Sequence, residues 1–103
     1  MTTTTYFVSR DSATATTDYD SAMAHASIAT TETLAEAQQA LTDYMTKEVA
    51  WLLDPKYLSS NSMRRAADIN DGIKAVRGMT PKANSRTSIR TAGLVWTIAR
   101  SER

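Results

Sequence analysis

The stretch Thr33–Leu53, TLAEAQQALTDYMTKEVAWLL, is the best-defined helix in the chain. Its apolar residues recur at spacings of three and four, which places them in one stripe along a helix: Leu34, Ala37, Leu41, Tyr44, Met45, Val49 and Leu52. Thr33 and Glu36 have the spacing of a capping box at its start, and Pro55 disfavours helical backbone at Asp54. The sequence therefore predicts a long helix whose apolar stripe packs on the core of the domain.

Glu48 interrupts this stripe with a carboxylate. Two interpretations fit its position: a side chain that pairs with an arginine or reaches water, and a buried carboxylate of the kind that serves in active sites. The sequence assigns no second acid and no histidine to work with Glu48. We therefore prefer the first interpretation.

The segment before the long helix predicts one strand and one ambiguous element. Thr3–Arg10 is rich in β-forming residues and predicts a first strand, which ends before Asp11. Residues 11–17 are polar, lack a period and predict a linker. Residues 18–28 fit a short helix, because several apolar side chains fall on one face, but residues 24–30 also fit a strand. The sequence leaves this choice open.

The segment after the long helix predicts a loop over residues 56–61 and a further helix over residues 62–77. The residues that can cap this helix are Ser60, Asn61 and Ser62. Gly78 is placed to adopt the left-handed conformation just past its end. Gly72 lies in the middle of the helix, where glycine is less stable than alanine. A reason for glycine at this position is a close approach of the helix to another element, which we therefore expect here.

The end of the chain predicts a polar, basic loop over residues 80–86 and a second β region over residues 87–100. Ala92-Gly93 is either the two-residue turn of a hairpin, 87–91 with 94–100, or a bend in one long strand. The whole order predicts a small single α+β domain over residues 1–103. In it, an antiparallel sheet, made of the N-terminal strand plus a C-terminal strand or hairpin, packs against two to three helices.

Composition limits the classes of protein to which the chain can belong. At 103 residues it has the size of one domain, and it carries few large aliphatic residues, so we expect modest stability, with a homodimer as one means of support. The lack of cysteine excludes disulfides and thiolate metal sites. The N-terminus does not resemble a signal peptide, and no stretch has the roughly 20 apolar residues of a membrane span. These features predict a cytoplasmic protein without a membrane partner.

No pattern in the chain predicts catalysis, a metal site or a cofactor. His25 is the single histidine, and nothing selects a serine and an acid to work with it. The triplet Asp18-Tyr19-Asp20 is similar to a metal-binding Asp-x-Asp, but it lacks the glycine and the distal glutamate of a calcium loop. We therefore expect a protein that is not an enzyme and that holds no metal or cofactor.

The charge of the chain is divided unevenly between its halves. Residues 1–55 have a balance of −6 and residues 56–103 a balance of +7, within a net charge of +1. Arginine forms bidentate contacts with carboxylates and phosphates, so a cationic surface in the second half would suit an anionic partner. The residues predicted to bind this partner are Arg64, Arg65, Arg77, Lys82, Arg86 and Arg90. The other interpretation is that the two halves interleave and that their charges pair or are solvated.

The opening TYFVSR (Thr5–Arg10), an alanine-rich helix and the terminal SIRTAGLVWTIAR (Ser88–Arg100) resemble the layout of small accessory proteins of phages and mobile elements. Anti-CRISPR proteins are among these. Because such proteins are diverse, the resemblance assigns no functional residue. It implies a viral, stoichiometric inhibitor that occludes a surface of a host defence complex in the host cytoplasm.

The leading hypothesis from the sequence is therefore a non-enzymatic binding protein that acts through charged surfaces on a protein or ribonucleoprotein partner. The alternative is a DNA- or RNA-binding regulator that uses the basic half. The aromatic residues that would stack on bases in that case have spacings more typical of a core: Tyr6, Phe7, Tyr57 and Trp96. A helix-turn-helix fits poorly, because the gap between the two predicted helices is about eight residues, against the usual three or four.

Overall fold

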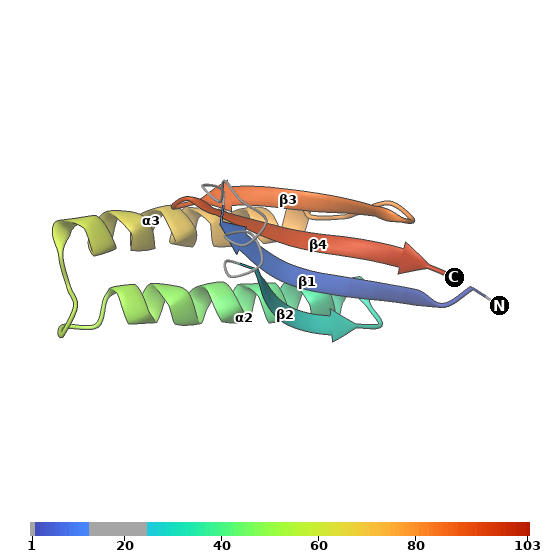
Figure 1. Ribbon diagram of the computed structural model, residues 1–103, viewed down its shortest axis with the longest axis horizontal. Coiled ribbons are helices and arrows are strands. Elements are labelled where there is room, and N and C mark those ends of the chain that lie inside the picture. The colour runs from blue at the N-terminus through green and yellow to red at the C-terminus, as the bar shows by residue number, and fades with distance from the viewer. Residues whose placement is uncertain (1, 13–24) are drawn as a thin grey trace.

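The computed structural model describes residues 2–12 and 25–103, which form a four-stranded antiparallel sheet and two helices. The elements are β1 (Thr4–Ser12), β2 (Ala26–Thr31), α2 (Leu34–Leu52), α3 (Ser60–Ala75), the 3-10 turn η1 (Val76–Gly78), β3 (Ser85–Thr91) and β4 (Leu94–Glu102). The strand order is β2-β1-β4-β3, and the strands pass in front of both helices in Figure 1. The predicted α+β class is confirmed.

The region before α2 differs from the helix that the sequence favoured. Residues 26–31 form β2, an edge strand on β1, so the strand alternative is correct there and the helix is wrong. Pairing with β1 overrides the local helical spacing, because the strand satisfies its backbone groups across the sheet. The first strand also runs further than predicted, through Ser12. The rest of the predicted linker and helix, residues 13–24, lies outside the described residues.

The two helices begin at side-chain caps. The Thr33 hydroxyl accepts from the Glu36 N–H at 3.2 Å, as predicted, and donates to the Glu36 carboxylate at 2.8 Å. At α3 the cap is Ser59, which forms a full capping box with Ser62, and not one of the three later residues that the sequence offered. Gly78 does not take the left-handed conformation, because η1 continues the helical path and Met79 closes it with an N–H bond to the Val76 carbonyl at 3.0 Å.

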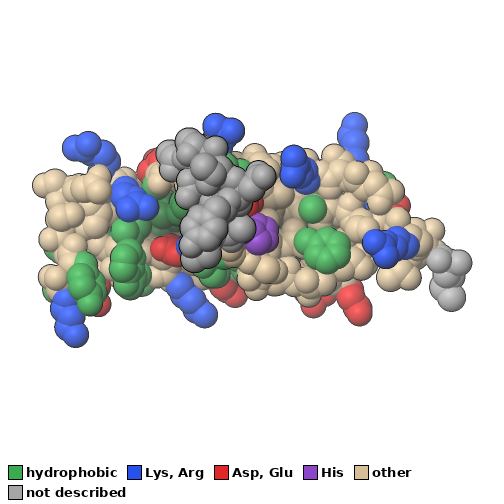
Figure 2. All heavy atoms as spheres, in the orientation of Figure 1, with side chains coloured by type: hydrophobic (Ala, Val, Ile, Leu, Met, Phe, Trp, Pro, Cys, Tyr) green, Lys and Arg blue, Asp and Glu red, His purple; other side chains and the backbone are tan. Residues whose placement is uncertain are grey.

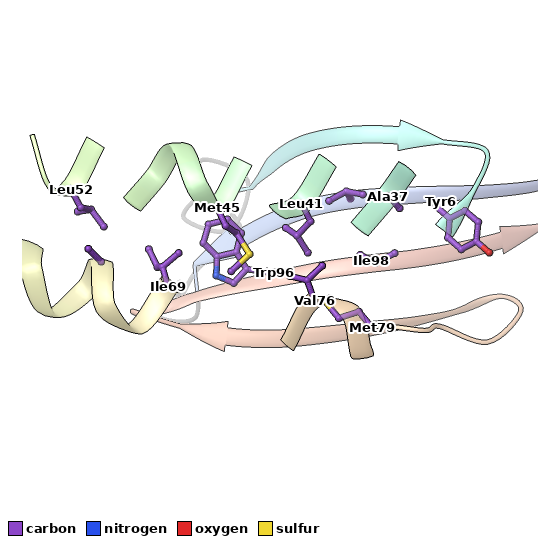
Figure 3. Close-up of a cluster of buried hydrophobic side chains, with 12 residues drawn as sticks. Tyr6, Ala37, Leu41, Met45, Leu52, Ile69, Val76, Met79, Trp96 and Ile98 are labelled. Carbon is purple, nitrogen blue, oxygen red and sulfur yellow. The ribbon is translucent and has the colours of Figure 1, made fainter. Parts of the chain in front are cut away.

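The core lies between the helices and one face of the sheet. Along β1 and β4 the even-numbered residues face the helices, since Tyr6, Val8, Trp96 and Ile98 are buried there. The side chains drawn in Figure 3 come from both layers: Tyr6, Ala37, Leu41, Met45, Leu52, Ile69, Val76, Met79, Trp96 and Ile98. The opposite face of the sheet carries no helix in the described part of the chain (Figure 1), so we call it the open face.

Helix α3 packs closely against the β3–β4 hairpin, as the glycine at position 72 led us to expect. A methyl group at Gly72 would overlap the Cγ2 atom of Thr91. The turn itself is the predicted pair Ala92-Gly93, with φ of 52° and 77°, which is the geometry of a two-residue hairpin turn. The Asp68 carboxylate, on α3, accepts from the Ala92 N–H. The helix therefore holds the turn as well as the strand.

The domain is a flat slab of 51 × 30 × 18 Å. Its two layers are offset: the α2–α3 hairpin extends past one end of the sheet, and β1 and β4 extend past the helices at the other end (Figure 1). This offset leaves two surfaces uncovered, one on the helices and one on the sheet. Neither α2 nor α3 has the length and apolar character needed to cross a membrane.

Candidate functional site

The six basic residues predicted to bind a partner lie in three places. Arg64 and Arg65 are in the second turn of α3, near the hairpin end of the slab. Arg77 and Lys82 lie beyond the other end of α3, which is about 18 Å away at 1.5 Å per residue. Arg86 and Arg90 alternate with Ser88 on the open face of β3. All six side chains are exposed, and none forms an ion pair with a carboxylate of the described residues.

The end of the α2–α3 hairpin carries a cluster of exposed apolar side chains that the charge pattern does not reveal. We call residues 51–63 the hairpin tip. Six large hydrophobic side chains among the described residues are exposed, and five belong to this tip, with 45–60% of their surface accessible: Trp51, Leu53, Tyr57, Leu58 and Met63. The rings of Trp51 and Tyr57 stack with centroids 6.0 Å apart and an interplanar angle of 30°.

The backbone of the tip is held by local hydrogen bonds. Leu53 ends α2 with its N–H bonded to the Val49 carbonyl at 3.1 Å. The Asp54 side chain accepts from the Lys56 N–H at 2.9 Å, and the Asp54 carbonyl accepts from the Tyr57 N–H at 2.9 Å. Such an Asx turn beside a proline presets the loop, so the aromatic pair is presented with little freedom left to lose on binding.

The tip is also cationic. Four basic residues lie at this end of the molecule: Lys47, Lys56, Arg64 and Arg65. Among the described residues of the tip, Asp54 is the carboxylate that forms no ion pair. Figure 2 shows hydrophobic side chains and Lys or Arg side chains close together at this end. The surface therefore combines aromatic, aliphatic and positively charged groups.

A shallow depression of about 610 Å³ lies beside the tip, between the end of the sheet and α2. Its polar centre is the pair of Arg10, from β1, and Glu48, from α2, with Nη1 and Oε1 3.0 Å apart. The Arg10 guanidinium also lies 5.9 Å from the centre of the Tyr44 ring. Glu48 thus pairs with an arginine, as the preferred interpretation predicted. Trp51 and Arg65 line the same depression, which connects it to the tip.

His25 lies at the edge of the open face, where its Nδ1 atom is 2.7 Å from the Asp11 carboxylate. Both side chains are close to half exposed, so His25 is a surface residue. The described residues contain no group of three potential metal ligands among His, Cys, Asp and Glu. Asp18 and Asp20 lie outside the described residues.

Sequence reasoning treated the aromatic residues as core, and this is correct for Tyr6 and Trp96 but wrong for Phe7 and Tyr57, which are exposed. It also missed Trp51. A usable signal was present: Leu53, Tyr57 and Leu58 are large apolar residues in and next to a predicted loop, where nothing in the pattern gives them a core position.

Compared with known proteins, the chain matches no family model, no curated protein and no solved structure.

Proposed function

We propose that this chain is a non-enzymatic binding protein that docks onto a protein partner through the hairpin tip. The observation that carries the proposal is the concentration of exposed large apolar side chains at one end of the molecule, five of six among the described residues. Contiguous apolar surface of this kind marks interaction sites on soluble domains.

The composition of the tip supports a protein interface. Trp, Tyr, Met and Arg are enriched in the centres of protein interfaces, and Trp, Tyr and Arg carry most of the binding free energy where they are buried. Trp51 and Tyr57 supply a stacked aromatic pair, and Arg64 and Arg65 lie on the adjoining turn of α3. The backbone hydrogen bonds of the tip reduce the entropy that binding would cost.

The charge of the tip supports an acidic partner surface. Lys47, Lys56, Arg64 and Arg65 have no ion-pair partner among the described residues, so their charges are available to carboxylates at the rim of an interface. The partner in this proposal is therefore a protein with an apolar pocket bordered by Asp and Glu. We propose that the chain acts in this way as a stoichiometric inhibitor of a protein or ribonucleoprotein complex, which is the role that the resemblance to phage proteins implies.

A photo-crosslinking amino acid at position 57 tests the proposal in cells, with the same group at Ala75 as the control. Ala75 is exposed but lies at the opposite end of α3. We expect a discrete cross-linked protein from position 57 alone. Equal products at both positions, a product made only of this chain, or cross-linking only to lipid would contradict a dedicated protein partner.

The captured protein, once purified, allows the affinity to be measured by calorimetry. Trp51→Ala and Tyr57→Ala should each weaken binding by roughly 30-fold, the effect expected for a residue at the centre of an interface. Arg77→Ala, a change outside the tip, is the matched control and should leave the affinity unchanged. If Arg77→Ala weakened binding as much as Trp51→Ala, the tip would not be the docking surface.

A further inference from the structure

The open face of the sheet has a built arrangement that the hairpin tip does not explain. Phe7 is the sixth exposed large hydrophobic residue among those described, with 46% of its surface accessible, and it lies on β1, one of the two inner strands. Across the sheet it pairs with Ala99 on β4, which pairs with Arg86 on β3. Phe7 and Arg86 are thus about 10 Å apart across two strand spacings, with a small side chain between them.

Three arginines lie on the same face as this aromatic residue and have no ion-pair partner among the described residues. Arg86 and Arg90 face the same side of the edge strand β3, about 13 Å apart along it. Arg103 lines a small hollow of about 240 Å³ together with Phe7. None of the three pairs with a carboxylate of the described residues, and Asp11, the described acid that faces the same side on β1, is bound to His25.

The remaining described positions of this face are mostly small and hydroxylated. Ser9 pairs with Thr97, and Thr97 forms a hydrogen bond with Ser88 at 2.9 Å. Thr5 and Ser101 are likewise cross-strand neighbours, next to Phe7. Figure 2 views this face and shows a hydrophobic side chain with Lys or Arg side chains near it, toward the free ends of β1 and β4. The described part of this face is therefore polar and positive, with one exposed aromatic ring.

We propose that this part of the open face binds single-stranded nucleic acid. Phe7 provides a ring on which one base stacks, and Arg86, Arg90 and Arg103 contact phosphates along the strand. Aromatic rings within a positive groove or sheet are the recurring means of holding unpaired strands, because every base has a stacking face and the backbone carries one charge per nucleotide.

The same features disfavour the other possible occupants. A protein interface of ordinary affinity needs a cluster of apolar side chains, and the described residues of this face include a single large one that is exposed. A duplex keeps its bases stacked on each other, so it could not use Phe7. The proposal does not depend on the hairpin tip, which is formed by the helix layer.

Fluorescence anisotropy with a labelled oligothymidylate of roughly 12 nucleotides tests the proposal on the purified full chain. Titrations between 50 and 200 mM salt should give a slope of log K against log salt of about −2, since each phosphate contact contributes about −0.7 for single strands. A labelled duplex of the same length should bind more weakly. An absence of binding at 50 mM salt, or equal binding of the duplex, would overturn the proposal.

Variants separate stacking from charge. Phe7→Leu keeps an apolar side chain but removes the ring, so it should weaken binding about fivefold or more with an unchanged salt slope. Arg86→Gln and Arg90→Gln should each make the slope shallower by about 0.7. The control Arg64→Gln, a charge on α3 beside the hairpin tip, should leave affinity and slope unaltered, and circular dichroism should match the parent for every variant. If Arg64→Gln had the effect of Arg86→Gln, or if polyglutamate competed as well as unlabelled oligothymidylate, binding would be a general property of the charge and the proposal would fail.

Discussion

The guanidinium of Arg10 lies 3.0 Å from the carboxylate of Glu48, and this pair joins the central strand β1 to the last turns of α2. Both side chains are about a quarter exposed, and the Arg10 Nε–H has no partner among the described residues. The exposure of this pair is therefore intermediate between that of a surface ion pair and that of a buried one. It also connects the sheet to the part of α2 that leads into the hairpin tip.

A double-mutant cycle with Glu48→Gln and Arg10→Met should give a coupling free energy of about 1–2 kcal/mol, between the values for exposed and buried pairs. Urea denaturation followed by circular dichroism measures it. The exposed pair Lys74–Asp71, at 3.8 Å, is the matched control and should show a coupling of at most about 0.5 kcal/mol. Equal coupling in both cycles would mean that burial does not strengthen the Arg10–Glu48 pair.

Gly72→Ala should destabilise the fold, against the usual helix preference. Alanine in a helix interior is normally favoured by about 1 kcal/mol over glycine. Here the new methyl group overlaps Thr91 Cγ2 and approaches Met45 Cε to 3.3 Å, so we expect a net loss of about 1–3 kcal/mol in the free energy of unfolding.

The second change Thr91→Ser identifies the cause of this loss. Serine removes Cγ2 but keeps the hydroxyl that accepts from the Trp96 indole N–H at 2.6 Å, so the double variant should recover most of the stability. Gly78→Ala serves as the control, because nothing lies within 4 Å of a methyl group at that position and its φ is not positive. A loss at Gly78 as large as that at Gly72 would contradict the steric explanation.

Ala92→Asn should stabilise the protein. Ala92 is held at a φ of 52° in the β3–β4 turn, and asparagine adopts this left-handed conformation more readily than alanine. We expect a gain of about 0.5–1 kcal/mol, seen as a higher urea midpoint with an unchanged m-value. Ala83→Asn, in the loop at the other end of β3, does not relieve a positive φ and should be neutral. A loss of stability at Ala92 would show that accommodating the added amide group costs more than the relieved backbone strain returns.

The two tryptophans should differ in accessibility and in their contribution to stability. Trp51 is 59% exposed and Trp96 is fully buried, so acrylamide should quench the first and spare the second. Trp51→Phe should therefore leave a blue-shifted, protected emission and change the free energy of unfolding by less than about 1 kcal/mol. Trp96→Phe should cost about 2 kcal/mol or more, because it leaves a void and the Thr91 hydroxyl without its donor. Quenching that persists in Trp51→Phe would place Trp96 closer to solvent than the structure does.

Much of the architecture follows from local signals. The α2 stripe and its Thr33 cap depend on neighbours a few residues apart, and both are confirmed. At Ala92-Gly93 the hairpin turn is the correct one of the two alternatives. Strand β2 was the ambiguous element, because its short alanine-rich segment has no strong preference and only the exposed edge of β1 makes it a strand. The three candidates for the α3 cap lie one to three residues after Ser59, since several polar residues there can each fill that role.

The candidate surfaces depend on long-range placement. Spacing and composition alone predict the two described helices, a turn or bend at Ala92-Gly93, a close approach at Gly72 and the surplus of cationic residues in the second half. Long-range packing is what places these cations in three regions, stacks Trp51 and Tyr57 beyond the end of the sheet and leaves Phe7 facing away from the helices. Two physical causes act. The offset between the layers leaves Trp51 and Tyr57 beyond the end of the sheet, whereas Phe7 is exposed because strand alternation places it on the face that no described helix covers.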